Sequence, residues 1–255
     1  MTSRIRYLAI GSSEPDRVAR FYMEYLGMEE IGRSSAGEVS VTDGVYNLSF
    51  LPPGDGVRQG LSHFGVAVDD IEDVRERLAK FSPGAKLERD RGGVHYGEYR
   101  LQDPEGYPVS ISASEFGMSS LDRRVPSIHH LAICERAGQK VAEFCADVLG
   151  LEKRDLETWR WIQRQLTDGI TGFTVLADAD QVREHGQEVT VDHQREGLNH
   201  FGLEANVPEL LARLPREANA TQRTDRPDSH DYFRVWDPDG NHFDLRSVGF
   251  WSRGG

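Results

Sequence analysis

The chain repeats itself, and this repeat limits the possible folds more than any other feature of the sequence. Four short segments recur in the same order at a similar distance further along the chain. They are Tyr7-Leu8-Ala9-Ile10 with His130-Leu131-Ala132-Ile133, Leu26-Gly27-Met28 with Leu149-Gly150-Leu151, Gly60-Leu61-Ser62-His63-Phe64-Gly65 with Gly197-Leu198-Asn199-His200-Phe201-Gly202, and Asp103-Pro104-Glu105-Gly106 with Asp237-Pro238-Asp239-Gly240. We therefore expect a tandem duplication, with copies over residues 4–114 and 127–248 and a linker between them.

Each copy divides again into two modules with the same order of elements. Residues 4–10 alternate as a strand does, and Pro15 follows capping residues at the start of a helix that Gly27 ends. The pattern restarts with a strand over 61–68, a helix over 71–81 and strands near 97–102 and 108–113. In the second copy it predicts strands over 128–134 and 198–204 and helices over 141–149 and 208–214. We predict four βαβββ modules whose short strands pair across module boundaries to bury one face.

Charge and composition exclude several classes of partner. The 255 residues carry a net charge of −12 and contain no basic block, which argues against a nucleic-acid partner or an anionic membrane surface. No apolar run approaches the length of a membrane span, and no export signal is recognisable. The two cysteines cannot form a disulfide framework. We expect a cytoplasmic protein.

Several of these landmarks together resemble one protein superfamily. They are His130-Leu131-Ala132-Ile133 on a first strand, Val148-Leu149-Gly150-Leu151 after it, Leu198-Asn199-His200-Phe201 in the next module, and the turn Asp237-Pro238-Asp239-Gly240-Asn241 before the last strand. The pattern is similar to that of the vicinal oxygen chelate superfamily, which includes glyoxalases, bleomycin-resistance proteins and type I extradiol dioxygenases. The resemblance implies an α+β fold of tandem domains, each a curved, incomplete β-barrel with its helices outside.

The resemblance also implies where a metal would bind, namely on the first strand of each module and on a module's last strand. These positions hold His130, His200 and Asp244 in the second copy, and Tyr7, His63 and Ser110 in the first. Two imidazoles and a carboxylate suit Fe(II), with Mn(II) or another divalent metal as an alternative. We expect one metal, bound in the C-terminal copy, which also carries seven of the nine histidines.

Two features of this ligand set depart from a simple pattern. The superfamily usually has glutamate where this chain has Asp244, and aspartate is shorter by one methylene. His242 lies two residues earlier on the same strand face, so it is an alternative ligand or a hydrogen-bonding neighbour. His129 becomes the alternative to His130 if the strand register is shifted by one residue.

Candidate catalytic residues come from the comparison with extradiol dioxygenases. His185 precedes His200 at the spacing where these enzymes resemble this chain in having an acid/base histidine. They also carry a tyrosine on the penultimate strand, where this chain has Arg234. Tyr232 and His230, at alternate positions before it, are the candidates for orienting substrate or oxygen. Arg234 could instead pair with a substrate carboxylate.

Three functions remain open at this stage. The first is a ring-cleaving extradiol dioxygenase acting on a small aromatic diol and O2. The second is a glyoxalase-like isomerase or lyase that uses the metal as a Lewis acid. The third is a non-catalytic small-molecule-binding protein of the bleomycin-resistance kind, which would not need the three ligands as a set. Edge strands and the tail ending at Trp251 leave a homo-oligomer open.

Overall fold

The computed structural model describes residues 3–54, 57–90, 97–117, 124–154, 163–194, 196–224 and 229–251. The first copy contains β1 (Ser3–Gly11), α1 (Pro15–Leu26), β2 (Glu29–Arg33), β3 (Val39–Thr42), β4 (Asn47–Leu51), β5 (Gly60–Val68), α2 (Ile71–Phe81), β6 (Glu88–Arg89), β7 (Tyr99–Gln102), β8 (Pro108–Ser112) and the 3₁₀ turn η1 (Glu115–Gly117). The second contains β9 (Ser127–Glu135), α3 (Gly138–Asp147), β10 (Glu152–Lys153), β11 (Gln163–Thr167), β12 (Gly172–Ala177), α4 (Ala179–Glu184), η2 (Val191–His193), β13 (Gly197–Ala205), α5 (Val207–Arg213), η3 (Arg216–Ala218), β14 (Thr221–Gln222), η4 (Ser229–Asp231), β15 (Phe233–Trp236) and β16 (His242–Ser247).

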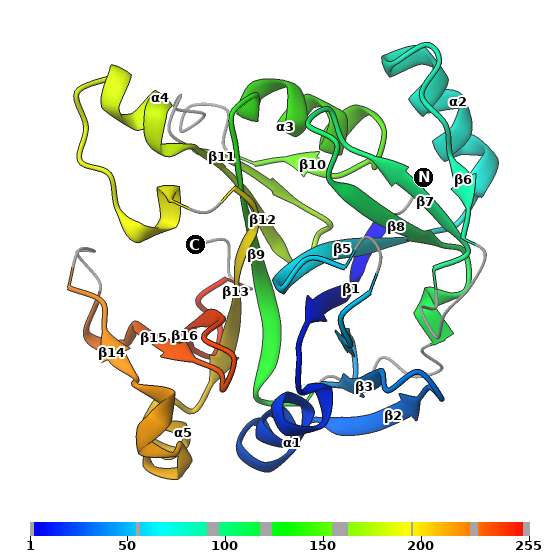
Figure 1. The fold of residues 1–255 in the computed structure, drawn as a ribbon. Helices are drawn as coiled ribbons and strands as arrows, with labels where there is room; N and C mark the ends of the chain where they lie inside the picture. The colour runs from blue at the N-terminus through cyan, green and yellow to red at the C-terminus, as the bar shows by residue number, and fades with distance from the viewer. Residues whose placement is uncertain are drawn as a thin grey trace. The chain divides into compact units, whose positions relative to one another are not determined.

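The strands form two sheets of eight, with the strand orders β2-β3-β4-β1-β5-β8-β7-β6 and β10-β11-β12-β9-β13-β16-β15-β14 (Figure 1). Each sheet uses the strands of one predicted copy, and its two modules meet where their first strands pair, at β1–β5 and β9–β13. Among the described strands, neither sheet closes into a barrel. The predicted α+β fold of four βαβββ modules is confirmed, while the limits 4–114 and 127–248 of the domains stay a prediction.

Local signals account for most helix ends. Helix α1 begins at Pro15 and ends before Gly27, whose φ of 67° gives the left-handed cap that glycine adopts without strain. The prediction for α2 was correct at both ends. The prediction for α3 was wrong at its start, because the helix begins at Gly138 rather than at residue 141. Glu105, from the other copy, accepts hydrogen bonds from the backbone N–H groups of Arg136 and Ala137 just before it.

The described chain packs into two compact units, and each unit takes segments from both copies. One unit contains Met1–Tyr7, His63–Gly117 and Leu131–Asn199, and the other contains Leu8–Ser62, Met118–His130 and His200–Gly255. In the second unit, Tyr22 of α1 packs against Phe50, Phe201 and Phe243. In the first unit, Phe64 packs against Phe173 with ring centroids 5.1 Å apart. The first copy therefore shares its aromatic packing with the second.

Two hairpin aspartates reinforce this exchange between the copies. Asp43 accepts hydrogen bonds from Val45 and Tyr46 of its own turn and, at 2.7 Å, from the backbone N–H of Ile128 on β9. Asp168 similarly binds its own turn and accepts a hydrogen bond of 2.8 Å from the backbone N–H of Ile5 on β1. Each copy thus fixes the first strand of the other through a buried carboxylate.

The predicted linker is partly built into the core. Phe116 of η1 is fully buried and stacks on Tyr7 with ring centroids 5.1 Å apart. The sequence suggested a linker here because serine and glycine surround this single aromatic residue. Residues 118–123 of the predicted linker lie outside the described residues.

The structure tests two further expectations, those on the cysteines and on membrane-spanning helices. Cys134 and Cys145 are free and buried, so they form no disulfide. Within the described ranges, no helix has the length and apolar character needed to cross a bilayer.

One buried carboxyl makes stability depend on pH. Burial raises the pKa of Glu135 to about 10, and its hydrogen bond with Glu105 adds to the effect. The folded state therefore retains a proton that the unfolded chain releases above a pH of about 4.5. The contribution of Glu135 to stability is therefore fully present below a pH of about 4.5 and is lost as the pH rises toward the folded pKa.

We expect Glu135→Gln to remove this dependence. The variant should be more stable than the wild type by more than about 1 kcal/mol at pH about 8, and the difference should shrink toward pH about 5, as measured by urea unfolding. Glu188→Gln, at an exposed position, is the control. The same pH slope in Glu135→Gln and wild type would contradict the prediction.

Candidate active site

Three neighbouring strands carry the predicted metal ligands. His130 lies on β9, His200 on β13 and Asp244 on β16, and these strands are consecutive in the second sheet. The rings of His130 and His200 have centroids 5.6 Å apart. His200 Nε2 lies 3.5 Å from Asp244 Oδ2. The structure brings all three side chains together within one unit.

Asp244 is completely buried and has several partners. Arg234, its cross-strand neighbour on β15, donates from Nε to Oδ1 at 2.9 Å, and the Tyr232 hydroxyl donates to Oδ2. Arg223 lies 3.8 Å from the same Oδ2. Burial acts to raise the pKa of Asp244, but His200, Arg234 and Tyr232 together hold this pKa well below its usual range. The carboxylate is therefore ionised at neutral pH.

His242 joins the same cluster from the start of β16. Its ring stacks on that of His200 with centroids 5.6 Å apart, and the two residues offer ligand atoms within 4.8 Å of each other. The rings of Trp236 and His242 have centroids 6.3 Å apart. His242 therefore stays an alternative ligand. His129, the other alternative, contacts Ser127 and Glu204.

Of the predicted catalytic residues, the structure places Tyr232 beside the ligands. Guanidinium groups lie over its ring, that of Arg246 at 4.5 Å and that of Arg223 at 5.3 Å. His230, in η4, is exposed. His185 is exposed at the end of α4, where its Nδ1 lies 2.8 Å from Gln181 O. His185 belongs to the other compact unit, and its proximity to the ligands stays a prediction.

The matching positions of the first copy have different chemistry. Tyr7 and His63 have ring centroids 5.7 Å apart, and Ser110 is completely buried on β8. A neutral phenol, one imidazole and a hydroxyl are a weak donor set for a divalent cation, because they supply no carboxylate. The expectation of one metal, bound in the second copy, stays a prediction.

Sequence reasoning missed Trp251 and Glu204. Trp251 stacks on His130 with centroids 5.3 Å apart and an interplanar angle of 4°. Glu204 is buried and accepts hydrogen bonds from the backbone N–H groups of Gly249 and Trp251, both at 2.7 Å. The signal that could have found Trp251 is the aromatic residue that follows the last strand in each copy, Phe116 in the first and Trp251 in the second.

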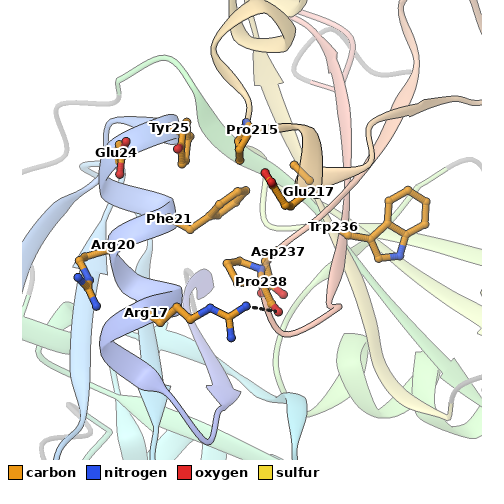
Figure 2. Close-up of a pocket in the computed structure, with 11 residues that line it drawn as sticks. Arg17, Arg20, Phe21, Glu24, Tyr25, Pro215, Glu217, Trp236, Asp237 and Pro238 are labelled. Carbon is orange, nitrogen blue, oxygen red and sulfur yellow. Dashed lines mark hydrogen bonds between the residues drawn. The ribbon is translucent and has the colours of Figure 1, made fainter.

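A separate pocket of about 460 Å³ lies between α1, η3 and the turn before β16. Figure 2 shows Phe21 and Tyr25 on α1 across from Pro215 and Glu217, with Arg17 donating to the Pro238 carbonyl at 3.3 Å. None of the predicted site residues lines it. The candidate active site is therefore the histidine and aspartate cluster rather than this pocket.

The donor set fits a divalent metal. When two ligand atoms each lie about 2.1 Å from a metal and subtend a right angle at it, they are about 3.0 Å from each other. The distance between His200 Nε2 and Asp244 Oδ2 is 3.5 Å, which is close to this value. Asp244 is already ionised, which is the form that ligates. Arg234 binds the other oxygen of this carboxylate, as the hydrogen-bonding neighbours of metal ligands commonly do.

Comparison with known proteins agrees with the fold. Residues 7–112 match the family model of a glyoxalase-like domain. This part of the chain therefore resembles a glyoxalase-like domain, a kind of domain found in the vicinal oxygen chelate superfamily. The match covers Tyr7, His63 and Ser110, so it lies in the copy with the weak donor set. A search of curated proteins finds no match.

Solved structures of this superfamily resemble the whole chain. The 2,3-dioxygenase LapB from Pseudomonas sp. KL28 is 15% identical, with a TM-score of 0.64 over 97% of this chain and 92% of that one. A Mn(II)-bound glyoxalase from Novosphingobium aromaticivorans is 16% identical, with a TM-score of 0.68 over 95% and 81%. An extradiol ring-cleaving dioxygenase from B. fuscum is 15% identical, with a TM-score of 0.68 over 98% and 72%. At these identities the likeness establishes the tandem fold alone and leaves the reaction open.

Proposed function

We propose that the chain is a metal-dependent, ring-cleaving dioxygenase of the extradiol type, acting on a catecholic substrate with O2. The observation that carries the proposal is the convergence of His130, His200 and an ionised Asp244 on three neighbouring strands. We assign Fe(II) to these ligands, with Mn(II) as the alternative. When bound, the metal would supply a Lewis acid for the two adjacent substrate oxygens and a site for O2.

The protein's own residues would prepare the ligands and the substrate. Arg234 and Tyr232 keep Asp244 ionised and oriented, because both donate to its oxygens. Tyr232 and the exposed His230 are our candidates for orienting the substrate. We assign His185 as the group that takes a catechol proton and returns it later, since an imidazole nitrogen can both accept and donate a proton. The structural neighbours described as dioxygenases support the proposed class of reaction.

A glyoxalase-like isomerase or lyase is the second candidate. The family match to a glyoxalase-like domain and the likeness to a Mn(II)-bound glyoxalase favour it. Such an enzyme would use the same ligands only to polarise substrate oxygens, with no consumption of O2. We propose the cytoplasm as the site of either reaction and aromatic catabolism as the setting of the first.

One experiment separates these candidates. The protein is purified anaerobically, its bound metal is assayed, and a catechol is added with and without O2. We expect bound metal, oxygen uptake and a yellow ring-cleaved product that carries both oxygen atoms. Bound metal without oxygen uptake across a panel of catechols would overturn the dioxygenase proposal and favour the second candidate. A protein without metal whose ligand binding is unaltered by His200→Ala would overturn both.

A further inference from the structure

The C-terminal segment after β16 returns to the candidate metal site and places an aromatic ring on one of its histidines. The ring planes of Trp251 and His130 differ by only 4°, so the indole covers one face of the imidazole. Trp251 is itself buried. The orientation of the His130 ring is therefore linked to the position of a residue far from it in the sequence.

A buried carboxylate holds this segment in place. Glu204, on β13, uses one oxygen for the backbone N–H of Gly249 and the other for that of Trp251. Hydrogen bonds from backbone N–H groups to a carboxylate are stronger than those between neutral groups. The carboxylate thus fixes the turn on both sides of Phe250, and Arg246 adds a contact with the Phe250 ring at 3.5 Å.

Gly202 shows how closely this segment fits. A Cβ added at Gly202 would lie 2.5 Å from the Trp251 ring and 3.0 Å from His130 Cβ. Only glycine leaves room at this point of β13 for the indole to reach the imidazole. Gly202 lies between His200 and Glu204 on β13. This one strand therefore carries the proposed ligand His200, the glycine that leaves room for the indole, and the carboxylate that binds the backbone of the Trp251 segment.

The first copy contains an equivalent stacked pair of rings, but the backbone of its second ring has a weaker hydrogen-bond acceptor. Phe116 stacks on Tyr7, and a Cβ at Gly65 would lie 2.6 Å from the Phe116 ring. The Phe116 backbone N–H is bound at 3.1 Å by the Ser112 hydroxyl, a neutral acceptor. The carboxylate anchor is found in the copy that has the two histidines and the aspartate.

We propose that Trp251 is a positioning residue for His130, and that Glu204 keeps Trp251 in place. The role that we assign to Trp251 in metal binding rests on the proposed metal site. A ligand ring that is already oriented loses less conformational freedom when a metal binds, so the affinity is higher. The stacking itself is a property of the protein without metal and can be measured separately.

The test uses the full chain, freed of metal with a chelator, and four variants. NMR of the histidine ring protons, assigned with His130→Asn, should show the His130 signals shifted upfield by the Trp251 ring current. Trp251→Leu should remove this shift and weaken Mn(II) binding by about 10- to 100-fold in titration calorimetry. Trp251→Phe should restore both in part, because phenylalanine keeps an aromatic face. Glu204→Gln should weaken both, since an amide offers one acceptor oxygen instead of two.

Phe116→Leu is the matched control, because it removes the equivalent ring from the first copy. It should leave the His130 signals and the Mn(II) affinity at their wild-type values. The inference is overturned if the wild type shows no upfield shift, or if Trp251→Leu binds Mn(II) as the wild type does. A wild type that shows the upfield shift but binds no divalent metal would overturn the proposed function, and with it the role in metal binding, while the stacking would stand.

Discussion

His200→Ala should abolish metal binding and, with it, any metal-dependent turnover. His200 is the central ligand of the proposed set, since its ring contacts that of His130 and its Nε2 lies beside Asp244 Oδ2. Loss of a group that merely supports a ligand commonly costs about 10- to 100-fold in metal affinity, so loss of the ligand should cost more than about 100-fold. Metal content after purification and Mn(II) titration measure the effect, with circular dichroism as the check on folding.

His63→Ala is the control for this prediction. His63 occupies the equivalent strand position in the first copy, where Tyr7 and Ser110 replace the other two ligands. The variant should retain the wild-type metal content. If His63→Ala loses metal and His200→Ala keeps it, the assignment of the site to the second copy is wrong. Unchanged metal binding in both variants would show that neither copy binds metal through these histidines.

Arg234→Met should destabilise the metal-free protein by about 3–5 kcal/mol, because it leaves the buried Asp244 carboxylate without its closest cation. Both side chains are almost completely buried and 2.9 Å apart. Urea unfolding in the presence of a chelator measures the free energy. Arg136→Met should leave the free energy of unfolding almost unchanged, because its ion pair with Glu196 is exposed and screened by solvent.

A double-mutant cycle separates the ion pair from packing. Asp244→Leu combined with Arg234→Met removes both charges, and most of the stability should return. Equal losses in Arg234→Met and in the double variant would contradict the prediction, because the damage would then come from lost packing rather than from an unpaired charge.

Much of the fold could be predicted because its signals are local. Pro15 and Gly27 mark both ends of α1, and the repeated motifs reveal four modules. The start of α3 could not be predicted, since Glu105 caps it from a position far away in the sequence. The buried role of Phe116 was missed for a similar reason, because its partner Tyr7 lies in the first strand of the same copy.

The candidate site divides in the same way. The resemblance to the vicinal oxygen chelate superfamily pointed to His130, His200 and Asp244, because the motifs that carry it can be read along the sequence. Their partners could not be read this way. Arg234 was considered for a substrate carboxylate, yet its Nε binds Asp244, since the register between β15 and β16 places the two opposite each other.

The sequence by itself determined the duplication, the four modules and the copy in which a metal site is expected. The duplication and the modules follow from repeated motifs and from periodic patterns of apolar residues, and the copy expected to bind metal follows from the family resemblance that these motifs carry. Only the tertiary structure decided that Arg234 and Tyr232 donate hydrogen bonds to Asp244 and that the Trp251 ring stacks on that of His130. The physical reason is that hydrogen bonds and ring contacts depend on strand register and on the return of distant segments, which no local pattern of residues records.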